Sequence, residues 1–159
     1  MWHKFNKPIL SKIRRASREY GLIQPYDKIA VGLSGGKDST VLLYCLSVLQ
    51  KTLPIPFGLV GIALDMGWNN DFKPIEEYCT SLGVPFHLEE TYIGRIVYEE
   101  RKEANPCSLC ANMRRGAINN LAKQMGCNKV AYAHHKDDII ETMLLSLIFE
   151  GRFHSFSPK

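Results

Sequence analysis

Short apolar runs alternate along this chain of 159 residues with longer stretches in which apolar residues recur every three or four positions. The short runs, bounded by turn residues, predict strands at 28–33, 56–65, 85–90 and 128–133. The longer stretches predict helices at 7–20, 39–50, 71–83, 112–126 and 137–151. This alternation predicts an α/β fold, a doubly wound parallel sheet with helices on both faces. Ligands of such sheets bind beyond the carboxyl ends of the strands.

Basic residues gather at the start of the chain. The formal net charge is a modest +4 at pH 7. Residues 1–20, however, contain Lys4, Lys7, Lys12, Arg14, Arg15 and Arg18, with Glu19 as their single acid. The apolar stripe expected on this predicted helix consists of Ile9, Leu10, Ile13, Ala16 and Tyr20. A basic helix suits the phosphates of a nucleic acid, and the solvated face of a packing helix explains the same charges.

The chain contains no apolar run near the roughly 20 residues that a membrane-spanning helix needs. Its first residues lack the apolar core of a signal peptide, so we expect a cytoplasmic protein without a membrane partner. The five cysteines are an odd set, and Cys107 and Cys110 stand in C-x-x-C spacing beside Arg114 and Arg115. This spacing favours a metal or redox pair over a disulfide framework, although two incidental thiols would give it too.

The segment "GLSGGKDS", at residues 32–39, joins a predicted strand to a predicted helix. It lacks the glycine spacing of both the Walker loop and the dinucleotide-binding loop. Its glycines can expose successive backbone N–H groups at a helix N-terminus, which binds anions, and Lys37 adds a positive charge. Asp38 would repel a phosphate unless a divalent cation lay between them. A tight turn before a capped helix is the alternative interpretation.

A second polar segment, "AHHKDDIIET" at residues 133–142, follows the last predicted strand. Asp137 and Asp138 at a helix N-terminus can serve merely as caps, which stabilise a helix by about 1 kcal/mol. Two histidines and two acids at the carboxyl end of a strand are more than capping needs. We therefore expect a functional cluster at this position.

In order along the chain, "SGGKDS", "CSLCANMRRG" and "AHHKDDIIET" resemble the motifs of the PP-loop ATPases, also called N-type ATP pyrophosphatases. The combination is most similar to the tRNA 2-thiocytidine synthetase branch, and the similarity covers nearly the whole chain. The 2-thiouridine and lysidine synthetases share part of the pattern and are kept as alternatives. The resemblance implies a basic N-terminal helix at residues 1–22 and a PP-loop nucleotide-binding domain at residues 23–159.

The resemblance also implies an activity, ATP-dependent thiolation of tRNA. AMP is transferred from ATP to the C2 oxygen of a base with release of pyrophosphate, and sulfide or persulfide then displaces AMP. The implied ATP-binding residues are Leu33, Ser34, Gly35, Gly36, Lys37, Asp38, Ser39, Ala63, Asp65, Ala133 and His134. The implied catalytic residues are Asp38, Arg114, Asp137 and Asp138, of which Asp38 and Asp138 would also hold Mg²⁺. The implied partners are tRNA, a sulfur donor (sulfide or a cysteine desulfurase) and a second copy in a homodimer.

In the family, the C-x-x-C thiolates bind a [4Fe-4S] cluster together with a third cysteine, which leaves one iron open to carry sulfide. The resemblance therefore implies Cys107 and Cys110 as cluster ligands. The family's third ligand lies further along than Lys159, and the spacing of Cys79 and Cys127 marks neither as its replacement. We therefore expect either a fragment, whose truncated domain binds ATP without activity, or a short variant with altered chemistry.

Overall fold

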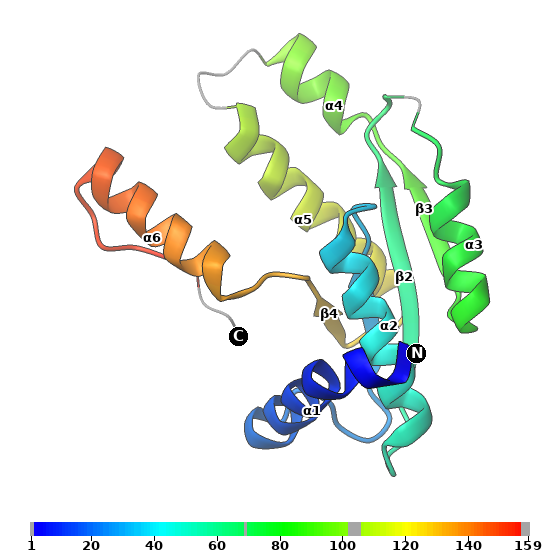
Figure 1. Ribbon diagram of the computed structural model, residues 1–159. Helices are drawn as coiled ribbons and strands as arrows, with labels where there is room; N and C mark the ends of the chain where they lie inside the picture. Colours follow the sequence, from blue (N-terminus) through cyan, green and yellow to red (C-terminus); the bar gives the residue numbers. More distant parts are fainter. Residues whose placement is uncertain (1, 69, 102–105, 157–159) are drawn as a thin grey trace.

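A computed structural model describes residues 2–68, 70–101 and 106–156 of the chain. It contains a four-stranded parallel sheet in the order β3-β2-β1-β4, with helices on both faces (Figure 1). The strands are β1 (Lys28–Gly32), β2 (Gly58–Asp65), β3 (Phe86–Glu90) and β4 (Lys129–Ala131). The predicted doubly wound α/β fold is therefore confirmed. The outer ends of the two predicted units, Met1 and residues 157–159, lie outside the described residues.

Helices form a layer on each face of the sheet. They are α1 (Trp2–Tyr20), α2 (Lys37–Thr52), α3 (Lys73–Leu82), α4 (Ile93–Arg95), the π-helix η1 (Ile96–Glu100), α5 (Pro106–Gln124) and α6 (Lys136–Glu150). Helices α2 and α3 cover one face, and α1 packs on α2. Helices α4, η1 and α5 cover the other face. The strand order reverses between β1 and β4, so the carboxyl ends of these strands form the switch point where such sheets bind ligands.

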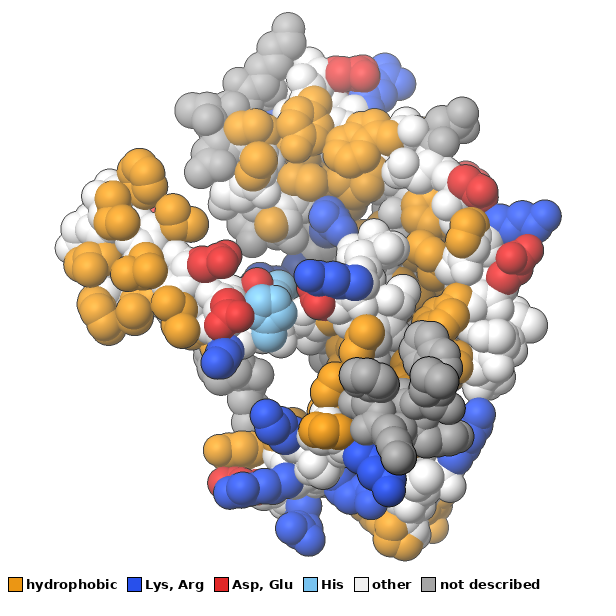
Figure 2. All heavy atoms as spheres, viewed as in Figure 1, with side chains coloured by type: hydrophobic (Ala, Val, Ile, Leu, Met, Phe, Trp, Pro, Cys, Tyr) orange, Lys and Arg blue, Asp and Glu red, His pale blue; other side chains and the backbone are white. Residues whose placement is uncertain are grey.

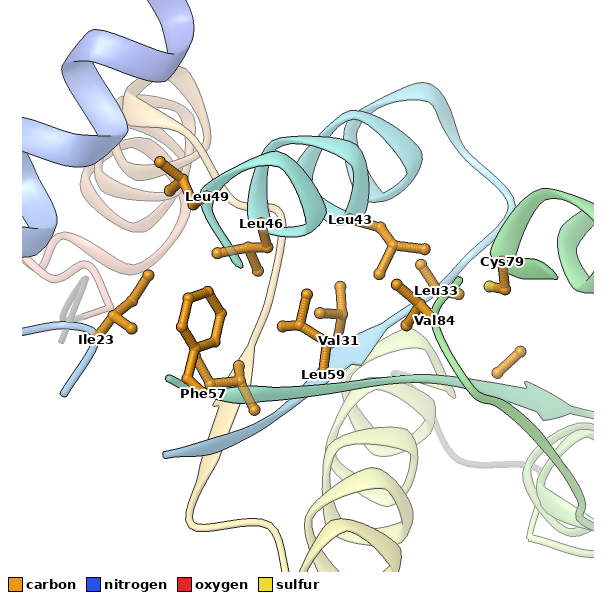
Figure 3. Packing of buried hydrophobic residues seen from close by; sticks show 12 residues of the cluster. Ile23, Val31, Leu33, Leu43, Leu46, Leu49, Phe57, Leu59, Cys79 and Val84 are labelled. Carbon is orange, nitrogen blue, oxygen red and sulfur yellow. The ribbon is translucent and has the colours of Figure 1, made fainter. Parts of the chain in front are cut away.

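The central strands contribute side chains to two separate cores. On the α2 side, Val31 and Leu59 pack with Leu43 and neighbouring leucines of α2 (Figure 3). On the opposite side, Val60 packs in a second cluster with Ile118 of α5. Because both faces of β1 and β2 are buried, their sequences are continuous apolar runs instead of alternating apolar and polar residues.

Several element boundaries differ from the sequence-based prediction. Helix α2 begins at Lys37, two residues earlier than predicted, and β4 is limited to 129–131. Helix α5 begins at Pro106 and not at residue 112, so the cysteine pair lies within its first two turns. The apolar stripe of α5 continues into these turns, because Leu109 and Cys110 pack on the second core.

The segment from α4 to η1 is a helix that the sequence analysis missed. Its buried residues Ile93 and Val97 are four positions apart and pack on the second core, a spacing that is itself typical of a helix. The segment leads from the end of β3 back over the carboxyl end of β2, where Gly94 N–H donates to Met66 O at 3.2 Å. It therefore brings residues 93–100 close to the end of β2.

Helix α1 starts at Trp2, five residues earlier than predicted, and contains Pro8. Its buried stripe is shifted, since Leu10 and Ile13 pack on the first core while Ile9 and Tyr20 are exposed. The described basic residues of α1 are exposed, and Arg14 Nη2 donates to Thr52 Oγ1 of α2 at 3.0 Å.

A buried carboxylate joins the amino ends of β1 and β4. Asp27 accepts hydrogen bonds from Gln24 N–H and from the Asn128 side-chain amide, both at 2.7 Å, and lies 2.8 Å from Lys129 Nζ. Burial alone would raise the pKa of Asp27, but the ion pair and the hydrogen bonds outweigh burial and hold the pKa below its usual value. This cluster fastens the edge strand β4 to the centre of the sheet.

Helix α6 extends away from the sheet (Figure 1) and forms a separate apolar lobe (Figure 2). The exposed apolar residues of this lobe are Ile140, Leu144, Leu145, Leu147, Ile148, Phe149 and Phe153. The buried Ser146 fixes the segment that follows, because its Oγ donates to His154 O at 2.7 Å. Within the described ranges, no helix combines the length and the apolar character that crossing a membrane requires.

Candidate functional site

The loop between β1 and α2 leaves the start of α2 open. Gly35 has a φ of +79°, in the region that favours glycine, and Gly36 precedes the helix without a side-chain cap. The first backbone N–H groups of a helix have no acceptor within the helix, so at an uncapped end they are available to a ligand. Ser34, Gly35, Gly36, Lys37 and Asp38 are all exposed. This arrangement fits an anion such as a phosphate.

Two predicted ATP-binding residues of this loop face the protein and not the solvent. Ser39 is buried and its Oγ donates to Gly36 O at 2.9 Å, while Ser34 Oγ lies 3.4 Å from the Ser39 hydroxyl. Leu33 is buried in the first core, and its N–H donates to Ile62 O of β2 at 2.8 Å. Leu33 and Ser39 therefore hold the loop in shape.

The carboxyl end of β2 contains the predicted residues Ala63 and Asp65. Ala63 is completely buried, so its side chain is not exposed to a ligand. Asp65 Oδ1 accepts the N–H of Gly67 at 2.9 Å, which shapes the turn after β2. The Asp65 carbonyl accepts both the N–H and the hydroxyl of Thr91, at 2.9 and 2.7 Å. These hydrogen bonds fix the ends of β2 and β3 to each other.

The start of α6 is closed by its own carboxylate. Asp138 Oδ2 accepts the N–H of His135 at 2.7 Å and lies 3.6 Å from His134 Nδ1. The hydrogen bond from His135, followed by the two nearby imidazoles, lowers the pKa of Asp138 below its usual value despite partial burial. Asp137 is exposed, with Oδ2 at 3.9 Å from His135 Nδ1. Asp138 therefore caps the helix, as the capping interpretation predicts. The carboxylate of Asp137 is more exposed and is more accessible to a ligand.

The start of α2, which follows β1, and the start of α6, which follows β4, lie next to each other at the switch point. We call them the β1–α2 corner and the α6 corner. A Cβ on Gly32, at the end of β1, would lie 3.2 Å from the ring of Tyr132, which follows β4. The Tyr132 hydroxyl donates to Asn119 Oδ1 of α5 at 3.0 Å. Burial raises the pKa of Tyr132, and the positive charge of Arg115 on α5 opposes this rise. Helix α5 thus borders the same corner, and its Arg114 is exposed.

Cys107 and Cys110 lie three positions apart near the start of α5, so they share a face of that helix. Cys107 is exposed and Cys110 is buried in the second core. The thiolate is the form of cysteine that binds metals. The arrangement fits two thiolate ligands of one group.

The remaining cysteines lie elsewhere. Cys45 and Cys79 are buried, and burial raises the pKa of both thiols. Cys127 follows the far end of α5, whose last residue, Gln124, lies about 25 Å along the helix axis from Cys107 at a rise of about 1.5 Å per residue. Among the side chains that the structure describes, no three His, Cys, Asp or Glu residues are grouped to hold a metal ion. Neither Cys79 nor Cys127 is placed as a third ligand.

Sequence reasoning missed two aromatic residues at this edge of the sheet, Trp68 and Tyr98. Trp68 follows the end of β2 and Tyr98 lies on η1, with ring centroids 5.9 Å apart. The apolar spacing of residues 93 and 97 could have revealed the helix that carries Tyr98. No periodic signal could have revealed the pairing, because it joins segments that are distant in the sequence.

Comparison with known proteins adds to this geometry. The chain is 43% identical over 155 residues to a tRNA-cytidine(32) 2-sulfurtransferase of Geotalea daltonii, covering 96% of this chain and 61% of that protein. It is 42% identical to the corresponding enzyme of Pelobacter propionicus over 94% of this chain and 58% of that one. The chain thus spans little more than half the length of these curated relatives.

Solved structures show the same fold. The U34-tRNA thiolase NcsA from Methanococcus maripaludis, solved with its [4Fe-4S] cluster, matches with a TM-score of 0.78 and 27% identity, over 94% of this chain and 52% of that one. The NH3-dependent NAD synthetase of Campylobacter jejuni matches with a TM-score of 0.56 and 14% identity, over 87% of this chain and 58% of that one, which shows the fold alone. The PP-loop domain family matches residues 6–155. The chain belongs to the PP-loop domain family.

Proposed function

We propose that this chain binds ATP and activates a tRNA base for thiolation at C2, as in the formation of 2-thiocytidine. The observation that carries the proposal is the open start of α2 at the end of β1, beside exposed Lys37 and Asp38. Its support from known proteins is the similarity to tRNA-cytidine(32) 2-sulfurtransferases. The U34-tRNA thiolase match keeps a 2-thiouridine product as the alternative.

ATP binding is assigned to the β1–α2 corner. The uncapped N–H groups of α2 and the ammonium of Lys37 would bind the β and γ phosphates, which leave together as pyrophosphate. Both groups stabilise negative charge as it develops on the leaving pyrophosphate. The hydrogen bonds of Asp65 fix the end of β2, where the adenosine is proposed to lie, and the contacts there would come mostly from the backbone.

Mg²⁺ is proposed to lie between the phosphates and the acids. Proteins commonly bind this ion through one or two carboxylates together with substrate phosphates, so a preformed group of three protein ligands is not required. Exposed Asp38 fits that role. Asp138 already accepts the N–H of His135, so it would contribute at most its second oxygen, and exposed Asp137 is the alternative carboxylate.

The base would be activated at the same edge of the sheet. Transfer of AMP to its C2 oxygen converts oxide, a poor leaving group, into a phosphate ester. Sulfide then forms the C2–S bond, and AMP departs with the oxygen. A persulfide would form the same bond with its outer sulfur, and a second thiol would then have to cleave the S–S bond and form a disulfide with the sulfur donor. Arg114, exposed on α5, is proposed to lie near the reacting base and to stabilise the negative charge on the phosphate.

Cys107 and Cys110 fit two ligand positions of an iron–sulfur cluster, because they lie three residues apart near the start of α5 and share a face of that helix. Held there, such a cluster would supply sulfide for transfer to the activated base. Among the described residues, no third histidine, cysteine or acid is grouped with these two thiols to hold a metal ion. Sulfide or a cysteine desulfurase is the proposed sulfur source, and the homodimer stays a prediction.

The exposed basic face of α1 is proposed to bind tRNA phosphates. Lys7, Lys12, Arg15 and Arg18 are exposed. Among the described contacts, Arg15 alone of these four forms an ion pair with an acid of the helix, Glu19, at 3.6 Å. Such contacts are independent of sequence and weaken with salt.

The first test measures pyrophosphate release from ATP and Mg²⁺ by residues 1–159, with and without unmodified tRNA. We expect release that depends on tRNA. The Asp38→Asn variant should lower the rate at least about 10-fold, the effect of removing one charged contact to the transition state. Glu150→Gln, which neutralises an exposed acid at the far end of α6, serves as the matched control.

Binding of ATP without tRNA-dependent release would show that the chain is only a nucleotide-binding module and would overturn the activation proposal. Nucleoside mass spectrometry of tRNA after anaerobic reconstitution with iron and sulfide then identifies the product. A tRNA that releases pyrophosphate but acquires a modification other than sulfur would point to another adenylating branch.

A further inference from the structure

Two exposed aromatic rings lie together at the carboxyl edge of the sheet. Trp68 is 54% exposed and Tyr98 is 47% exposed. Their ring centroids are 5.9 Å apart, with an angle of 55° between the ring planes. The two residues come from separate segments, the turn after β2 and the π-helix η1. Large aromatic rings that remain half exposed have ring surface available to a ligand.

The position of Trp68 is fixed by the backbone of α4. A Cβ on Gly94 would lie 2.7 Å from Trp68 Nε1 and 2.5 Å from Met66 O, so only glycine permits this close approach. On the next turn, Val97 is completely buried in the second core and anchors the segment that carries Tyr98. Both rings are therefore held on packed elements.

The pair lies on the face of the sheet that α5 covers. Val97, next to Tyr98 on η1, packs in the second core together with Cys110 of α5. Desolvation raises the pKa of the Tyr98 phenol, and the nearby thiols of Cys107 and Cys110 raise it further. Trp68 follows three residues after Asp65, at the strand end assigned to the nucleotide. The rings thus lie between the end of β2 and the cysteine pair.

We propose that Trp68 and Tyr98 form a stacking platform for an unpaired pyrimidine base of RNA. The inference rests on the proposed function, because a base whose C2 oxygen is replaced must reach both the activated phosphate and the sulfur. Proteins read unpaired bases by stacking them on aromatic side chains, and enzymes that modify bases hold them outside the helical stack. Cytidine and uridine, named in the related enzymes, are both pyrimidines.

Stacking predicts a specific pattern of affinities. Removal of the aromatic side chain on which a base stacks should weaken RNA binding by about 5- to 30-fold. The loss should affect single-stranded RNA and not a duplex, whose bases are stacked on each other. The slope of affinity against salt should stay unchanged, because the rings carry no charge and neutralise no phosphate.

The fluorescence of Trp68 provides the measurement. The chain contains two tryptophans, so in the Trp2→Phe protein Trp68 is the single reporter. The probe is a cytidine-rich RNA about ten nucleotides long, used alone and annealed to its complement. We expect the single strand to quench Trp68 and the Tyr98→Leu variant to bind it about 5- to 30-fold more weakly. Tyr98→Phe, which keeps the ring, should bind nearly as well as the parent.

The matched control is Tyr26→Leu, which removes an exposed tyrosine (86% exposed) before β1, at the opposite edge of the sheet. Thermal unfolding checks that each variant is folded, and Trp68→Leu, measured with a labelled RNA, repeats the test on the second ring. Unchanged affinity in Tyr98→Leu and Trp68→Leu, or equal losses for single strand and duplex, would overturn the platform. Intact base-selective binding without any tRNA thiolation would instead overturn the proposed function alone.

Discussion

Helices α2 and α6 begin with the same dipeptide, Lys-Asp at 37–38 and at 136–137, yet their N-termini are in opposite states. In α6 the third residue, Asp138, accepts the N–H of His135 and fills the helix start with negative charge. In α2 the third residue is Ser39, whose hydroxyl donates to Gly36 O and leaves the helix start without a cap. The start of α2 can therefore accept an anion, whereas the start of α6 presents carboxylates to a cation.

The two helices also differ in how they are held. The leucines of α2 at positions 43, 46 and 49 are buried in the first core, with Leu43 completely buried. Those of α6 are exposed, with Leu144 at 45% of its surface. In the part of the chain described here, α2 is supported by tertiary packing, whereas α6 depends mainly on its own hydrogen bonds and caps.

The largest expected effect concerns this difference in packing. Leu43→Ala should lower the free energy of unfolding by about 3 kcal/mol, because it leaves a cavity in a filled core. Leu144→Ala, the same change on α6, should alter it by less than about 0.5 kcal/mol. Urea unfolding followed by circular dichroism measures both. Equal losses would show that α6 packs on the body of the protein in solution.

The second prediction concerns a substitution that makes the start of α2 resemble the start of α6. Ser39→Asp places a carboxylate at the third position of α2, where it would occupy the N–H groups and repel phosphate. We expect ATP affinity to fall about 100-fold, since like charges brought together cost several kcal/mol. Ser39→Asn has the same shape without the charge and should lose much less. Isothermal titration calorimetry with ATP and Mg²⁺ distinguishes the two, and equal losses would mean that the loop shape alone matters.

The third effect compares the first residues of the two helices. Lys37→Ala should weaken ATP binding about 10-fold, because a hydrogen bond from a charged group contributes about 1.5–3 kcal/mol. Lys136→Ala removes an equally exposed lysine at the start of α6 and should leave ATP binding unchanged. Titration of both variants with ATP checks the assignment. A larger loss in Lys136→Ala would place the phosphates at α6.

The smallest effect is the pH dependence of the α6 corner. The pKa of Asp138 lies below its usual value, so its carboxylate stabilises this corner above the ordinary pKa of about 4. This contribution is lost as the pH falls through the lowered pKa of the folded state. The NMR shift of the His135 amide proton should therefore titrate with a midpoint below about 4.

In Asp138→Asn the same amide proton should show no such titration, while Glu141→Gln, on the exposed next turn, should titrate like the parent. A midpoint at or above the ordinary value would contradict the hydrogen bond from His135.

The sequence predicted the strands and the helices well where burial produced a continuous or periodic apolar pattern. The completely buried Val31 and Leu43 belong to such segments. The sequence did not predict which apolar helix faces are buried, because the spacing of apolar residues does not distinguish Leu144 from Leu43. Helix α4 with η1 was missed because eight residues between a strand and a polar segment give a short pattern.

The candidate site was predicted in part. Three contiguous motifs could be recognised in the sequence: the Gly-rich loop, the cysteine pair and the acid pair. Their location at one edge of a sheet could also be predicted, because parallel strands align their carboxyl ends. The roles of Ser39 and Asp138 depend on hydrogen bonds that the sequence does not show. Pairing of Trp68 with Tyr98 depends on the space left by Gly94, which is visible only in three dimensions.

The buried Asp27 also determines where the molecule opens first. Strand β4 is a short edge strand, and its residues Lys129–Ala131 are only half-buried. Its pairing with β1 covers only residues 129–131, and the ion pair of Asp27 with Lys129 and the hydrogen bond from Asn128 strengthen this attachment. Local unfolding begins where apolar contacts are few, so acid that protonates Asp27 should detach β4, and the α6 corner with it, before the α2 corner melts.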